Sequence, residues 1–145
     1  MTTLRRGDLF DPECPTRRLL DRIGTKWVSM AVKVLADAGA EEVRFAELRR
    51  RMPGVSQKML SQTLQGLTAD GLIGRRVADT VPPAVYYTLT PLGRSLVGPL
   101  DVLRAWAEEH MVEVDEQRAA ASRPLDRDLP GKPGARQPAE ETPRV

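Results

Sequence analysis

The sequence predicts a mainly α-helical protein with one small β-hairpin, an α+β fold. Apolar residues recur at three- and four-residue steps in several separate stretches, which is the spacing of helices that bury one face. Two short β-prone runs, LIGRRV and AVYYTL, interrupt this pattern and are separated by the proline-containing segment ADTVPP. The chain has 145 residues, enough for one domain and an additional helix or two for association.

The N-terminal part of the chain predicts an arm and two helices. Residues 1–13 are polar and aperiodic, so we expect a flexible arm. In CPTRRLLDRIG, Pro15 suits the first position of a short helix and Gly24 ends it. Thr25 can cap the following helix, KWVSMAVKVLADAG, for which Gly39 supplies the stop.

The middle of the chain contains a helix-turn-helix signature. EEVRF predicts a short strand, and FAELRRRM predicts a helix that Pro53-Gly54 must break. Ser56 then caps a second helix, which runs to about Asp70 and stops at Gly71. Two helices joined by a short glycine-containing turn are typical of this motif.

The C-terminal half predicts a wing and a long helix. LIGRRV and AVYYTL form a hairpin, and Thr90 caps a final helix that begins at Pro91 and should kink at Gly98-Pro99. The complete order of elements is that of a winged helix-turn-helix domain, which we assign to residues 14–118, with additional N- and C-terminal dimerisation helices. Residues 119–145 are rich in proline and arginine and contain no aromatic residue, so we expect a disordered tail.

The second helix of the motif carries an unusual polar stripe. In VSQKMLSQTL the apolar residues Val55, Met59, Leu60 and Leu64 share helical spacing, and the other side holds amides and hydroxyls with a single lysine. A winged helix places this helix in the major groove, where such groups bond base edges. The alternative is a merely solvated face. We predict base contacts from the exposed polar residues Ser56, Gln57, Lys58, Ser61, Gln62 and Gln65.

Basic residues gather around the same motif. Seven basic residues and two acidic ones lie between Arg44 and Arg76, a local charge of +5 in a chain whose formal charge is only +2. Contacts to phosphates supply affinity and register without reading sequence. Arg49, Arg50 and Arg51 cannot all point at DNA, since they follow one another on one helix. We predict backbone contacts from Arg44, Arg49, Arg75 and Arg76.

The last helix carries an apolar row that one small domain cannot cover. Each fully buried leucine contributes about 1.5 to 3 kcal/mol, so a few of them could hold a dimer together. The alternative is contact with the N-terminal helices of the same chain. A two-fold dimer would place its recognition helices about 34 Å apart and read an inverted repeat. The row consists of Leu92, Leu96, Leu100, Leu103, Ala107, Met111 and Val114.

Several segments together resemble the HxlR-type winged helix transcriptional regulators of bacteria. They are CP near the N-terminus, IGTKW, RFAEL, PGVSQKMLSQTLQGLTADGLI, VPPAVYYTLTPLGRSL and LRAWAEEH, and they span roughly Cys14 to His110. The resemblance implies a homodimer in which the first and last helices form the interface, through Leu19, Leu20, Leu96, Leu100, Leu103 and Ala107.

The resemblance is weakest in the wing. VPPAVYY stands where the family commonly shows VPPRVEY, which removes a basic and an acidic position, and Ala78 and Asp79 replace the usual Tyr-Pro. Wing contacts are therefore the least transferable part of the comparison.

Cys14 is the only cysteine, so the chain can form no internal disulfide, and we expect a reducing, cytoplasmic location. Pro15 would place the sulfur beside helix amides that lower a thiol pKa, and Arg17 and Arg18 are near. The resemblance implies a redox or electrophile sensor at this position. One thiol per chain could cross-link only between subunits or form a mixed adduct. The alternative is a small half-buried residue beside the dimer interface.

Other functions find less support. His110 is the only histidine, which excludes a histidine-based metal cluster or catalytic triad, so we expect no cofactor and no enzymatic activity. No apolar run approaches the ~18 residues of a membrane span. Aromatic and methionine side chains could line a pocket for an apolar effector or belong to the core: Trp27, Tyr86, Trp106 and Met111.

These observations predict a homodimeric, sequence-specific regulator of transcription that binds double-stranded DNA. A repressor is favoured because the sequence shows no second effector or activation domain. The expected partners are DNA, a second copy of the chain, and a small-molecule or oxidant effector, with no membrane. The rival interpretation is a winged helix used as a protein-protein interaction module, for which neutral glutamines would serve a polar interface. Salt separates the two, because phosphate-driven binding weakens steeply as salt is added.

Overall fold

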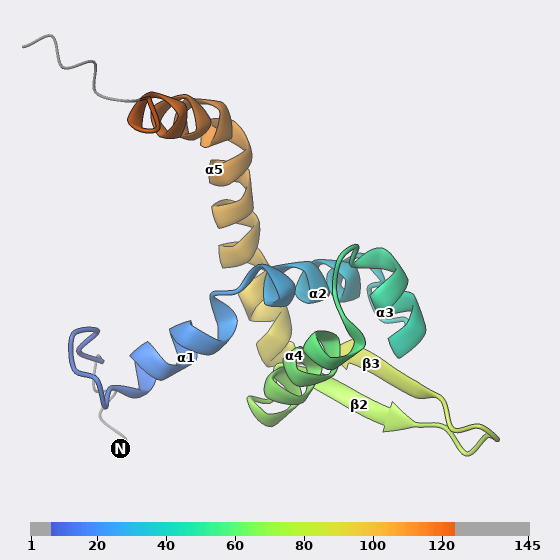
Figure 1. Ribbon diagram of the computed structural model, residues 1–145. Coiled ribbons are helices and arrows are strands. Elements are labelled where there is room, and N and C mark those ends of the chain that lie inside the picture. Colours follow the sequence, from blue (N-terminus) through green and yellow to red (C-terminus); the bar gives the residue numbers. More distant parts are fainter. Residues whose placement is uncertain (1–6, 124–145) are drawn as a thin grey trace, which may run out of the picture. The chain divides into compact units, whose positions relative to one another are not determined.

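The computed structural model describes residues 7–123. The order of its elements confirms the predicted winged helix-turn-helix fold (Figure 1). The elements are α1 (Pro15–Ile23), α2 (Lys26–Asp37), β1 (Val43–Arg44), α3 (Phe45–Arg51), α4 (Gln57–Ala69), β2 (Ile73–Val77), β3 (Val85–Leu89) and α5 (Pro91–Ala121).

The chain divides into two compact units at Glu108. The first unit contains the winged domain and the part of α5 up to Glu108. Within the described residues, the second unit holds the end of α5 from Glu109. In this described part of the chain, no helix has the length and apolar character that would let it cross a membrane.

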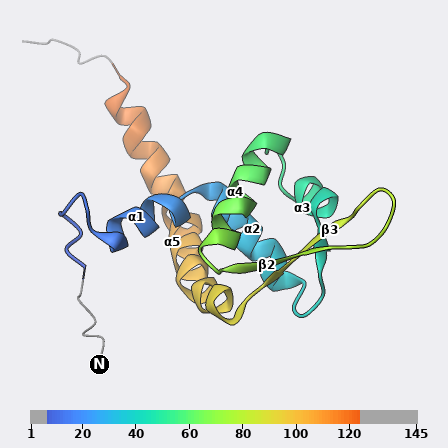
Figure 2. The ribbon, with the colours of Figure 1, turned by 90° about the horizontal axis from the view of Figure 1, so that it is seen from below.

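The strands form one antiparallel sheet in the order β1-β3-β2. In the hairpin, Ile73 lies opposite Leu89 and Val77 lies opposite Val85, so residues 78–84 form the tip of the wing. The short strand β1 adds to the free edge of β3, with Val43 opposite Tyr87. Figures 1 and 2 show the hairpin projecting beyond the helices that carry it.

The core lies between α2, α3 and α4 and one face of the sheet. Leu35, Leu48, Met52, Leu60 and Leu64 are almost completely buried there. The sheet contributes Ile73 at the start of β2 and the alternate residues Val85, Tyr87 and Leu89 of β3, because successive side chains of a strand point to opposite faces. Burial of this apolar surface, at roughly 25 cal/mol per Å², is the main force that fixes α4 against the wing.

The predicted helix ends are confirmed by their hydrogen bonds. The hydroxyl of Thr25 accepts a hydrogen bond from the amide of Val28 at 3.3 Å, and that of Ser56 accepts one from Met59 at 3.0 Å. Gly71, at φ +73°, leaves α4 through the left-handed backbone region that favours glycine. These local signals set the length of the helices that position the functional surface.

Two predictions differ in detail from the structure, and a third is only partly covered by it. Met59 shares the spacing of the apolar stripe but is 41% exposed, because it lies at the edge of the buried face of α4. The helix α5 continues through Pro99 and ends at Ala121, past residue 119, where we expected the tail to begin. Residues 1–6 of the predicted arm and 124–145 of the predicted tail lie outside the described residues.

The apolar row of α5 is only partly covered by its own subunit. Leu96 and Leu100 pack against the core, whereas Leu92 and Leu103 are 57% and 60% exposed. Helix α1 contributes no buried residue to the domain, and its leucines are exposed as well. Two apolar helix faces therefore remain without a covering partner within the described part of one chain.

Candidate nucleic-acid interface

The burial of α4 determines which of its side chains face outward. Leu60, Leu64 and Leu67 are fixed in the core, so residues on the far side of this helix must point to solvent. Gln57, Lys58, Gln62 and Gln65 are exposed, and Ser61 is half-buried. The polar stripe of the sequence is therefore a continuous outward surface of amides, a hydroxyl and one ammonium group.

A groove separates this surface from the wing, and we call it the wing-side groove. Gln57, Ser61 and Gln65 line it from α4, and Arg75 lines it from β2. The buried ring of Tyr87 in β3 also lines this groove. Arg75 makes no ion pair with any residue between 7 and 123, so its guanidinium remains available to an anion.

The basic residues of α3 lie in different environments. Arg49 and Arg50 border the start of α4 beside Gln57. The Nε of Arg50 donates a hydrogen bond to Glu47 at 2.9 Å, which lowers the pKa of that carboxyl. A guanidinium nitrogen of Arg51 lies 3.9 Å from the carboxylate of Asp37. Arg49 has no such partner in the described chain and is the α3 cation best placed for a phosphate.

Arg44 and Arg76 lie on the outer face of the sheet rather than in the wing-side groove. Their guanidinium carbons are 5.9 and 4.7 Å from the centroid of the Tyr86 ring. Arg76 also donates two hydrogen bonds, of 2.7 and 2.6 Å, to the carboxylate of Glu42. These hydrogen bonds lower the pKa of Glu42. Neighbouring strand residues alternate between faces, which is why Arg75 and Arg76 separate.

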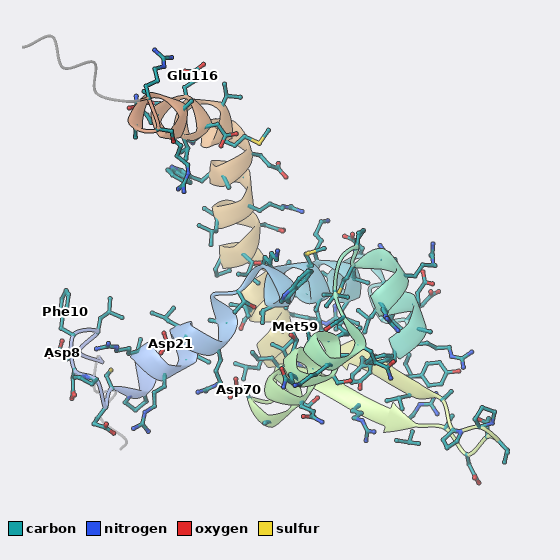
Figure 3. The ribbon with its side chains drawn as sticks, in the orientation of Figure 1. Asp8, Phe10, Asp21, Met59, Asp70 and Glu116 are labelled. Carbon is teal, nitrogen blue, oxygen red and sulfur yellow. The ribbon has the colours of Figure 1, made fainter. Side chains whose placement is uncertain are left out.

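One ion pair at the end of α4 has no signal in the sequence. The guanidinium of Arg22, in α1, donates two hydrogen bonds of 2.8 and 2.9 Å to the carboxylate of Asp70. Asp70 is the C-terminal cap of α4, and Figure 3 shows it at the opposite end of that helix from Met59. Arg22 and Asp70 are far apart in sequence, so the spacing of residues alone could not predict their contact. The contact connects α1 to the C-terminal end of α4.

The environment of Cys14 combines an activating and a protecting feature. The thiol is buried, with 4% of its surface exposed, at the N-terminal cap of α1. The backbone amide of Arg17 lowers the pKa of this thiol, with smaller help from Thr16, while burial acts in the opposite direction. A Cβ atom at Gly7 would lie 2.7 Å from the sulfur, so this glycine lets the chain pass closely over it.

The aromatic residues considered for an effector pocket are not brought together as a group. Trp27 lines a groove beside α4. Tyr86, in contrast, lies between two arginines on the outer face of the sheet. A pocket that joins these two rings is therefore not formed.

The fold and this surface define a class of protein. A winged helix-turn-helix domain that presents a hydrogen-bonding helix face free of carboxylates beside unpaired arginines is typical of a DNA-binding transcriptional regulator. The protein-family model described as HxlR-like helix-turn-helix matches residues 22–115, and the chain belongs to that family.

Individual relatives agree with this assignment. The uncharacterized HTH-type transcriptional regulator YtfH of Escherichia coli is 39% identical over 120 residues, which cover 81% of this chain and 93% of YtfH. The solved structure of YtfH from Salmonella typhimurium has a TM-score of 0.71 at 40% identity, covering 78% of this chain and 98% of that one. The redox regulator HypR in its reduced form has a TM-score of 0.62 at 35% identity, covering 70% and 98%. Members of this class act on transcription and are not enzymes.

Proposed function

We propose that the protein is a homodimeric repressor that reads an inverted repeat through α4. The observation that carries the proposal is the wing-side groove, where three polar side chains of α4 lie beside the unpaired Arg75. Glutamine amides bond adenine at two atoms, and a serine hydroxyl donates to or accepts from several bases. Carboxylates, which phosphates would repel, are absent from the lining of this groove.

Repression is the simplest outcome of this architecture. A dimer bound across a promoter excludes other proteins from that DNA without any further module. The described residues consist of one winged domain and the end of α5, and neither supplies a separate activation domain. Binding at the promoter is therefore sufficient for the proposed activity.

The homodimer is supported by apolar surfaces that one subunit leaves uncovered. Leu19 and Leu20 of α1 and Leu103 of α5 are exposed, although each would contribute about 1.5 to 3 kcal/mol if it were buried. A two-fold axis through these helices would present two copies of α4 to one face of DNA, about 34 Å apart.

We also propose that Cys14 makes DNA binding responsive to oxidants or electrophiles. Its pKa is lowered by the first amides of α1, which favours the reactive thiolate. The likeness to a protein described as a redox regulator supports the idea. Because the thiol is buried, the segment around Gly7 has to open before a reagent can reach it.

Binding to duplexes selected from a random pool tests the base-reading proposal. The selected duplex should be retarded, with a log-log salt slope near −0.9 for each phosphate neutralised. A shallow slope would favour the rival protein-interaction module. Gln62→Ala should cost about 1 to 3 kcal/mol at one base pair and relax the preference there. Equal losses on every sequence would contradict base reading by α4.

The neighbours Arg75 and Arg76 provide a matched pair for the backbone contacts. Arg75→Ala should weaken binding to all sequences alike and reduce the salt slope by about 1. Arg76→Ala should have a smaller effect, because Arg76 faces the opposite side of the sheet and is held by Glu42. A larger loss for the Arg76 variant would place the DNA on the outer face of the wing.

The role of Cys14 is tested on the same duplex. Hydrogen peroxide should weaken retardation of the wild-type protein, and Cys14→Ser should not respond. An unchanged response in the serine variant would exclude this residue as the sensor.

A further inference from the structure

A second groove lies on the other side of α4, and we call it the α1-side groove. It has a volume of about 280 Å³ and is lined mainly by apolar side chains from the corner between α1 and α2 and from α4. Ile23, Trp27, Met59 and Leu67 are among them. The ion pair between Arg22 and Asp70 contributes the only charged groups of this lining.

Gly66 gives this groove its depth. A Cβ atom added at this position would meet no atom within 4 Å, although Gly66 lies in the interior of α4. A glycine inside a helix costs roughly 0.5 to 1 kcal/mol relative to alanine, and here neither a positive φ nor a close neighbour requires it. The missing side chain leaves an open apolar hollow against the recognition helix.

We propose that the α1-side groove is the binding site of a small, uncharged aromatic effector. The volume suits a molecule of one or two rings, and the indole of Trp27 offers a surface for stacking. The charges of Arg22 and Asp70 satisfy each other, so the two charged residues of the lining provide no free partner for an ionised ligand. The ammonium of Lys26, outside the lining, lies 4.5 Å from the centroid of the Trp27 ring and favours an electron-rich aromatic group beside it. The uncharged side chains of Gln62 and Thr63 can bond one hydroxyl or carbonyl group of the ligand.

The same groove links the effector to DNA. Gln62 is both a lining residue and a member of the polar stripe, so a ligand that bonds its amide withdraws that amide from a base. The inference rests on the proposed function, because the consequence of binding is release of the operator. By linkage, DNA must weaken effector binding by the same factor.

The test uses 1-naphthol as the probe and protein labelled with 5-fluorotryptophan. Trp27 and Trp106 are the two tryptophans, and single Trp→Phe variants assign their fluorine resonances. We expect 1-naphthol to shift the Trp27 resonance in a saturable manner and to weaken retardation of the selected duplex. Naphthalene-1-sulfonate, which adds a charge to the same rings, should bind at least 10-fold more weakly.

Gly66→Leu should fill the hollow and abolish the shift while leaving the duplex retarded. Ala69→Leu adds the same side chain to α4 at a residue that lines the wing-side groove, and it should leave the shift intact. An unchanged titration of the Gly66 variant, or no response of Trp27 in the wild-type protein, would overturn the inference. If Gly66→Leu sediments as a monomer, the groove is covered by the partner subunit in the dimer, and the effector proposal is wrong. Wild-type protein that retards no duplex would contradict the proposed function rather than the effector site.

Discussion

Two glycines in helices of this protein have opposite structural roles. At Gly93, in the first turn of α5, an added Cβ atom would lie 1.9 Å from the carbonyl oxygen of Leu72. At Gly66 the same atom would meet open space. Helix α5 can therefore approach Leu72, the residue before β2, only because residue 93 lacks a side chain. At Gly66, in contrast, no neighbouring atom requires the absence of a side chain.

These surroundings predict opposite effects of the same substitution. Gly93→Ala should lower the free energy of unfolding by about 1 to 3 kcal/mol, the usual cost of forcing an extra carbon into a packed contact. Gly66→Ala should raise it by about 0.5 to 1 kcal/mol, because alanine is the better helix former. Urea unfolding followed by circular dichroism measures both. A stabilised Gly93 variant would mean that α5 does not pack against Leu72.

The cap of the recognition helix allows a second comparison at the level of single residues. Ser56→Ala should lower the free energy of unfolding by about 0.5 to 2 kcal/mol, since the amide of Met59 loses its 3.0 Å partner. Ser61→Ala, in the middle of the same helix, removes no cap and should have a smaller effect. Chemical denaturation of both variants provides the measurement, and equal losses would argue against capping by Ser56.

At the scale of elements, local sequence signals predicted the bounds of the helices, but they could not predict that β1 pairs with β3. Helix α4 begins after Ser56 and ends before Gly71 as expected, because a capping residue and a glycine in the left-handed region act on neighbouring residues. The separation of Arg75 from Arg76 follows from strand alternation once the register is known. The addition of β1 to β3, which brings Glu42 to Arg76, joins segments distant in sequence, and no spacing rule anticipates it.

The surface of α4 also has one feature that the sequence predicts and others that it does not. Its polar stripe could be predicted because the helical period places those residues opposite Leu60 and Leu64. The two grooves beside it could not, because each depends on a second element, the wing on one side and the α1-α2 corner on the other. Met59 was misjudged for this reason, since the period places it at the margin and only the neighbouring groove decides its exposure.

The contact between Glu42 and Arg76 predicts an acid-sensitive wing. The hydrogen bonds from Arg76 lower the folded-state pKa of Glu42 below its ordinary value of 4.5. The resulting stabilisation is therefore complete above pH 4.5 and is lost as the pH falls through the lower, folded-state pKa. Glu42→Gln should reduce stability at neutral pH, and its difference from the wild type should shrink in acid.

The free energy of unfolding measured from pH 7 to pH 3 provides this comparison. Glu41→Gln removes the neighbouring carboxylate, which forms no ion pair with Arg76, and serves as the charge control. A difference between wild type and the Glu42 variant that stays constant down to pH 3 would show that the ion pair does not stabilise the folded wing.

At the scale of the whole molecule, the C-terminal end of α4 is connected to the helices on either side of the motif. The ion pair between Arg22 and Asp70 connects α1 to the end of α4, and the hydroxyl of Thr90 donates a 2.6 Å hydrogen bond to the carbonyl of Gly71 just beyond it. Both contacts lie where α4 ends. If α4 reads DNA as proposed, these two contacts connect α1 and the start of α5 to the helix that does so.

The proposed dimer can be tested through a matched pair of residues in α5. Leu103 belongs to the apolar row and is 60% exposed in the single subunit, whereas Val102 is 71% exposed and lies outside the row, about 100° around the helix from Leu103. Leu103→Asp should convert the dimer to monomers in sedimentation experiments, because a carboxylate buried in an apolar interface has no partner. Val102→Asp should remain dimeric.

DNA binding should follow the oligomeric state. A monomer engages one half-site at a time, so Leu103→Asp should lose most of its affinity for the inverted repeat and bind a single half-site as the wild-type subunit does. Linking two half-sites multiplies affinity because the second contact is intramolecular, typically by a factor of roughly 10² to 10⁴. If Leu103→Asp stays dimeric while Val102→Asp dissociates, the interface lies on the side of α5 that carries Val102, and the apolar row serves its own subunit.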